Sequence, residues 1–117
     1  MKNKFILILV YILFFFNTNL FSNENTKVLK VGLLAPLIGE YKELGNSLLY
    51  SLQLALNEVN DENVFIIPGD SGFNNKEKLN AAIQDLESKG VKIIIGPITH
   101  EEFDEIKKYD NLTFISP

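Results

Sequence analysis

The sequence contains no cysteine and only one histidine, and both shortages narrow what the protein can be. Without cysteine there is no disulfide framework, no thiolate zinc site and no cysteine nucleophile. Because His100 is the single histidine, a metal site built from several histidines is excluded, and no serine is placed to complete a Ser-His-Asp triad. We therefore expect a protein without enzymatic activity, metal or cofactor, stabilised by packing alone.

Positive charge is scarce beyond the N-terminus. The 117 residues carry a formal net charge of −4, but Lys2 and Lys4 stand at the very start. After residue 23, nine lysines face fifteen acidic residues, which gives a net charge of −6. An acidic chain repels phosphate groups, so nucleic acid is not an expected partner. The hydrophobic fraction of 46% indicates a packed core, and the length permits one domain.

The N-terminal segment has the three-part layout of a secretory signal. Lys2 and Lys4 precede an unbroken apolar run over residues 5–16, and the polar stretch 17–25 follows. Twelve apolar residues form about 18 Å of helix, whereas the hydrocarbon core of a membrane is roughly 30 Å thick. The run is therefore better suited to export than to spanning a membrane.

We expect a signal peptide over residues 1–22, with cleavage after Ser22. The mature chain, residues 23–117, is then expected in the periplasm. The alternative is an uncleaved membrane anchor over residues 5–21, which would require three polar residues inside or at the edge of the bilayer.

Apolar runs and helical stripes alternate along the rest of the chain. Short aliphatic runs predict strands, and apolar residues at spacings of three and four predict helices. Leu44, Leu48, Leu52, Ala55 and Val59 form the longest such stripe, which predicts the buried face of one helix. The expected strands are residues 28–35, 64–68, 91–95 and 112–115, and the expected helices are 44–59, one from an Asn74 cap to Gly90, and one from a Thr99–Glu102 capping box to Tyr109.

This alternation predicts an α/β fold. No tight hairpin joins any two strands, so the crossovers should be right-handed and the sheet mostly parallel, with helices on both faces. We expect the strand order 2-1-3-4, a Rossmann-like arrangement in which the last strand is an edge.

Ligands of open parallel sheets bind beyond the carboxyl ends of the strands, here at the loops that begin near Pro36, Gly69, Gly96 and Pro117. No loop contains G-x-G-x-x-G or G-x-x-x-x-G-K, so neither a dinucleotide nor a P-loop phosphate site has its glycine scaffold. Asp70 follows the second strand and could bind a ligand, but Asp followed by Ser-Gly is ordinary turn chemistry, which we favour.

Three further side chains are candidates for this edge. His100 is either exposed helix surface or a ligand contact, because it stands at the start of a helix that faces the edge. Tyr41 and Leu44 either form a wall of a binding cleft or begin the buried stripe of their helix, and for Leu44 we favour the stripe.

The stretch KVGLLAPLIGEYKELGNSLLYSLQLALNEVN resembles the opening of the type I periplasmic substrate-binding proteins, the leucine/isoleucine/valine-binding family. GVKIIIGPITHEE and TFISP continue the resemblance, which covers nearly all of residues 27–117. It implies the N-terminal lobe of a non-enzymatic protein whose two lobes close on an amino acid or similar solute and deliver it to a membrane transporter permease.

The resemblance also implies a ligand site. In that family the solute carboxylate meets hydroxyls and backbone N–H groups at the start of the helix after Gly-Pro, which corresponds to Thr99 and His100. Tyr41 and Leu44 complete the expected ligand-binding set. His100 replaces the Ser or Thr of many members, and the acidic turn over residues 101–105 disfavours an anionic ligand.

The same stretches are similar to the domain of penicillin-binding-protein activators, envelope proteins that act through protein contact. The alternative function is therefore that of an interaction protein whose partner is a cell-wall synthase. Members of both groups are several hundred residues long, so we expect residues 23–117 to be a truncated lobe whose exposed last strand lets copies self-associate.

The signal interpretation makes a direct prediction. The mature protein should begin close to Asn23 and appear in the envelope fraction, because the apolar run is too short to hold it in the membrane. N-terminal sequencing of the accumulated protein measures this. A chain that keeps Met1 and stays with the membrane after a salt wash would establish the anchor instead.

Overall fold

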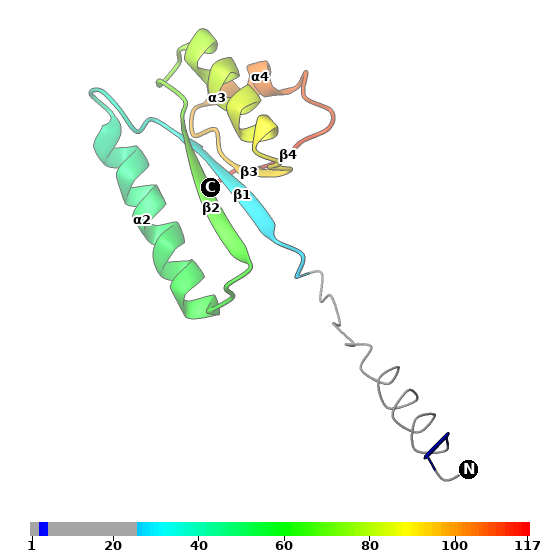
Figure 1. Cartoon of the computed structure of the whole chain (residues 1–117). Coiled ribbons are helices and arrows are strands. Elements are labelled where there is room, and N and C mark those ends of the chain that lie inside the picture. Colours follow the sequence, from blue (N-terminus) through cyan, green and yellow to red (C-terminus); the bar gives the residue numbers. More distant parts are fainter. Residues whose placement is uncertain (1–2, 5–25) are drawn as a thin grey trace.

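A computed structural model describes residues 3–4 and 26–117 of the chain (Figure 1). The expected signal peptide and its cleavage site therefore lie, apart from two residues, outside the described part. Within that part, no helix is both long enough and apolar enough to span a bilayer.

The strands of residues 26–117 form one parallel sheet in the order β2-β1-β3-β4. β1 is Leu29–Ala35, β2 is Val64–Asp70, β3 is Ile93–Ile95 and β4 is Thr113–Ile115. The predicted fold class, parallel pairing and strand order are confirmed. Because all four strands point the same way, their carboxyl ends share one edge of the sheet.

The sheet has helices on both faces (Figure 1). Helix α2, Lys42–Val59, lies on one face, and α3, Lys76–Ser88, lies on the other together with the short α4, His100–Ile106. The core fills the α3 side, where Leu34 and Ile94 of the sheet pack against Leu79, Ile83 and Leu86 of α3. These five residues are essentially inaccessible to solvent, so burial of this face is the main source of stability.

The α2 face is covered less completely. Helix α2 contacts β1 and β2 but neither β3 nor β4, and no other described helix lies on that half of the face. Gly45 is the only buried residue of α2, while Leu48 and Leu52 are half-buried. The prediction of a buried stripe is wrong for Leu44, Ala55 and Val59, which are exposed. The less exposed side of α2 is instead formed by Gly45, Leu48, Leu49, Leu52 and Leu56, so the buried face is rotated about the helix axis from the predicted stripe.

Element boundaries differ from the expected ones for local reasons. The cap of α3 is Asn75, whose side chain accepts the Lys78 N–H, and not Asn74. Asn74 adopts a left-handed conformation, with φ of 56°, and its polar groups bond elsewhere. Val91 is not in β3, because its N–H donates to Leu86 O and so completes the end of α3.

Gly45 lets α2 start against the end of β1. A Cβ at this position would stand 1.9 Å from the carbonyl oxygen of Pro36, which is backbone and cannot rotate away. The first turn of α2 therefore packs directly on the chain that leaves β1, and this contact places both at the carboxyl edge.

We expect Gly45→Ala to destabilise the fold by about 1 to 3 kcal/mol, because the steric clash outweighs the roughly 1 kcal/mol that alanine gains over glycine in a helix. Chemical denaturation measures the difference. Asn46→Ala, at the exposed next position, is the control and should be neutral or slightly stabilising. An unchanged midpoint for Gly45→Ala would show that α2 does not pack closely on Pro36.

Candidate functional site

The carboxyl edge of the sheet has a topological switch point. From β1 the chain passes to β2 on one side, and from β2 it returns to β3 on the other side of β1. The loops after β1 and β3 therefore diverge, and between such loops open parallel sheets bind their ligands. This places the candidate site at the residues that follow Ala35, Asp70, Ile95 and Ile115.

Asp70 holds two of these loops together. Its Oδ1 accepts the Leu37 N–H at 2.9 Å and the Gly72 N–H at 3.3 Å. Ser71 N also donates to Ala35 O at 2.9 Å. The bond to Gly72 is the turn role expected of Asp70, and the bond to Leu37 adds a tether between the loops after β1 and β2 that the turn motif alone did not indicate.

Thr99 and Glu102 form the capping box predicted for α4. Glu102 Oε2 accepts the Thr99 N–H at 3.4 Å, and Glu102 Oε1 accepts the Asn74 N–H at 3.2 Å. The Thr99 hydroxyl donates to Asn74 Oδ1 at 2.6 Å. Glu102 is only 2% exposed, so a buried carboxylate joins the loop after β2 to the start of α4.

The other acids of α4 divide into paired and exposed groups. Lys76 donates to Glu105 at 2.7 Å, and this hydrogen bond raises the pKa of Lys76 and lowers the pKa of Glu105. Lys107 donates to Asp104 at 2.6 Å and lowers the pKa of Asp104 in the same way. Glu101 is exposed and has no ion pair among the described residues.

His100 is exposed at the first position of α4, and no hydrogen bond to its imidazole occurs within residues 26–117. It is free to meet a ligand or solvent. No group of three or more His, Asp or Glu side chains in the described part of the chain is arranged to hold a metal ion.

Tyr41 stacks on Phe73. The ring centroids lie 3.7 Å apart and the planes differ by 15°. Phe73 adopts a left-handed conformation, with φ of 48°, which is uncommon for an aromatic residue. The stack ties the loop before α2 to the loop before α3, so Tyr41 packs at the edge rather than beginning a buried helical stripe.

Leu44 borders a hollow at the same edge. The hollow has a volume of about 310 Å³ and lies between α2 and the residues that follow β3 and β4. We call it the edge hollow. It is lined by Leu44, Ser47, Leu48, Ser51, Ile98 and Pro117.

The structure thus separates the four candidate residues that the sequence indicated. Leu44 lines the edge hollow, Tyr41 packs on Phe73, and Thr99 and His100 lie at the start of α4 and do not line the hollow. Sequence reasoning missed Asn74 and Phe73 as partners, because their contacts join loops separated along the chain. Ile98 and Pro117 could have been found, since each lies within three residues of the end of a strand.

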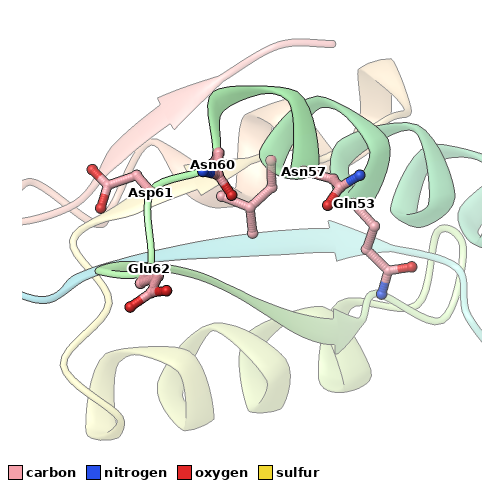
Figure 2. A pocket seen from close by; sticks show the side chains of 6 residues that line it. Gln53, Asn57, Asn60, Asp61 and Glu62 are labelled. Atoms are coloured by element: carbon pink, nitrogen blue, oxygen red, sulfur yellow. The ribbon is translucent and has the colours of Figure 1, made fainter.

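A second hollow lies at the opposite end of the sheet. Figure 2 shows it beside the last turns of α2 and the turn that leads into β2. Its volume is about 280 Å³. It lies at the amino ends of the strands, away from the switch point, so we do not assign the candidate site to it. It is lined by Gln53, Leu56, Asn57, Asn60, Asp61 and Glu62.

Comparisons with solved structures identify the architecture. The chain superimposes on an ABC transporter substrate-binding protein from Sphaerobacter thermophilus with a TM-score of 0.67 and 23% identity, over 75% of this chain and 26% of that one. The chain has the fold of part of a periplasmic-binding-protein lobe. No family model and no curated protein matches the sequence.

Full-length LpoA from Haemophilus influenzae is also similar, with a TM-score of 0.60 and 21% identity over 78% of this chain. The C-domain of LpoA, described as a regulator of PBP1A, superimposes with a TM-score of 0.58 and 20% identity over 74% of this chain. The chain spans 16% of full-length LpoA and 27% of the C-domain. At these identities the likeness establishes the fold, and both the expected family and its runner-up share that fold.

The Asp70 tether can be tested by two substitutions at one position. Asp70→Ala removes the acceptor of two backbone N–H groups and should cost about 1 to 3 kcal/mol of unfolding free energy. Asp70→Asn keeps an oxygen at Oδ1 and should cost clearly less. Chemical denaturation of both variants measures this. Equal losses would mean that the negative charge of Asp70, and not the hydrogen bonds, stabilises the edge.

Proposed function

We propose that the chain belongs to an exported solute-binding protein that holds a small molecule at the carboxyl edge and delivers it to a membrane transporter. The observation that carries this proposal is the position of the edge hollow. It adjoins the carboxyl ends of β3 and β4 and the first turns of α2, next to the switch point of the sheet. Ligands of this architecture bind at that place.

The edge hollow is an open surface on one side. Leu44 is 48% exposed, so the residues described here form one wall and the floor of a binding site. In the two-lobed arrangement that the sequence resemblance implies, a second lobe would enclose a solute bound there. The arrangement supports reversible binding, and no nucleophile and general base are paired at this edge within residues 26–117.

A second candidate function is envelope regulation by protein contact. The likeness to LpoA supports it, and so does the outer side of α2. Tyr50 is 63% exposed and Leu54 is 50% exposed on that side, away from the sheet. Large apolar side chains gathered on an exposed helix are typical of protein contact surfaces. In this case the partner would be a cell-wall synthase, such as the PBP1A that the C-domain of LpoA is described as regulating.

One pair of substitutions separates the two functions. Leu44 and Leu54 are about equally exposed on the same helix, so aspartate at either position should leave the fold intact. For solute binding, a screen of amino acids, amides, amines and small organic acids should find a compound that raises Tm by several degrees. That rise should disappear in Leu44→Asp and persist in Leu54→Asp, measured by thermal shift on the purified chain.

The regulatory function predicts the reverse pattern. No compound would stabilise the chain, and the immobilised chain would retain a cell-wall synthase identified by mass spectrometry. Leu54→Asp would abolish that retention, whereas Leu44→Asp would not. This outcome would overturn the transporter proposal.

A further inference from the structure

We infer that the solute held in the edge hollow carries no negative charge and binds through an uncharged apolar group. This inference rests on the proposed function and specifies the chemical class of the solute. It differs from the expectation of an amino-acid carboxylate at Thr99 and His100. Three features of the described residues support it.

The first feature is a carboxylate of the chain itself at the start of α4. Free N–H groups at a helix start attract anions. Here Glu102 already accepts the Thr99 N–H, and the Thr99 hydroxyl donates its hydrogen to Asn74. Both hydrogen-bond donors of Thr99 are therefore used within the chain, and a solute carboxylate that bound Thr99 would have to displace a buried internal acceptor.

The second feature is the charge that a bound anion would meet. Glu102 forms no ion pair with any described residue, and neither does the exposed Glu101 beside it. The lysines near α4 are engaged by Glu105 and Asp104. Lys76 lines the same small hollow as Glu101 and Glu102 but is already paired with Glu105. An anion at the start of α4 would therefore face two carboxylates whose neighbouring lysine is engaged, which is unfavourable.

The third feature is the lining of the edge hollow. None of its six lining side chains is charged. Its two hydroxyls are also used, because Ser47 Oγ donates to Glu43 O at 2.7 Å and Ser51 Oγ donates to Ser47 O at 2.9 Å. The hollow therefore offers apolar contact and no counter-charge, and a charged group would lose its hydration there without compensation.

Four compounds of similar shape test the charge class. Isovaleramide is neutral, isovalerate is anionic, 3-methylbutylamine is cationic, and leucine is zwitterionic, while all four carry the same branched alkyl group. We expect isovaleramide to bind and isovalerate to bind at least about tenfold more weakly, because like charges oppose it. Titrations followed by amide signals in NMR spectra measure both affinities, and the signals of Leu44, Ile98 and Ser51 should shift.

A charge variant tests the cause. Glu102→Gln removes the charge and keeps one oxygen, which can accept only one of the Asn74 and Thr99 N–H groups that the two carboxylate oxygens accept separately. The variant should reduce the ratio between the affinities for isovaleramide and isovalerate several-fold. Glu58 is an exposed acid at the far end of α2. Glu58→Gln is therefore the matched control and should leave the ratio of the two affinities unchanged.

The outcomes distinguish this inference from the proposed function. If isovalerate or leucine binds as tightly as isovaleramide, the charge class is wrong and solute binding stands. If Glu102→Gln and Glu58→Gln behave alike, Glu102 is not the cause. If none of the four compounds, and no compound of the wider screen, perturbs the hollow, the proposed function and this inference both fail.

Discussion

The buried carboxylate of Glu102 is the interaction on which the geometry of the carboxyl edge depends. It accepts N–H groups from Asn74 and Thr99, and so joins the loop after β2 to the start of α4. Buried carboxylates are costly unless hydrogen-bonded, so loss of either hydrogen bond would destabilise the edge. The same carboxylate contributes, with Asp70 and Glu101, to the negative charge of the edge, which connects the architecture of the site to the class of solute that we infer.

The two faces of the sheet have different roles: one carries the core and the other borders the edge hollow. On the α3 side, apolar residues of β1, β3 and α3 form a closed core that holds the strands in register. On the other side, α2 covers only β1 and β2 and leaves a hollow beside β3 and β4. Close packing at Gly45 brings the start of α2 against Pro36, so the hollow opens at the same edge as the polar network.

Hydrophobic pattern and turn chemistry were sufficient to predict the strands, their parallel pairing and their order, because each run is short, aliphatic and bounded by turn residues. They also predicted the Thr99–Glu102 capping box, which is a local motif. Hydrophobic pattern and turn chemistry did not predict the contacts that join segments distant along the chain. Asn74 was expected to cap α3, but its bonds to Glu102 and Thr99 leave that role to Asn75. Leu44 was expected in a buried stripe, but periodicity does not tell which strands a helix covers.

The most direct test of the account is amide hydrogen exchange at Thr99 and Asn74, measured by NMR on the unaltered chain and on Glu102→Ala. Both amides should exchange slowly in the unaltered chain, because Glu102 accepts their hydrogen bonds, and both should lose protection in the variant. Fast exchange at Thr99 in the unaltered chain, with protection gained only when acetate is added, would contradict it. The start of α4 would then be an open anion site.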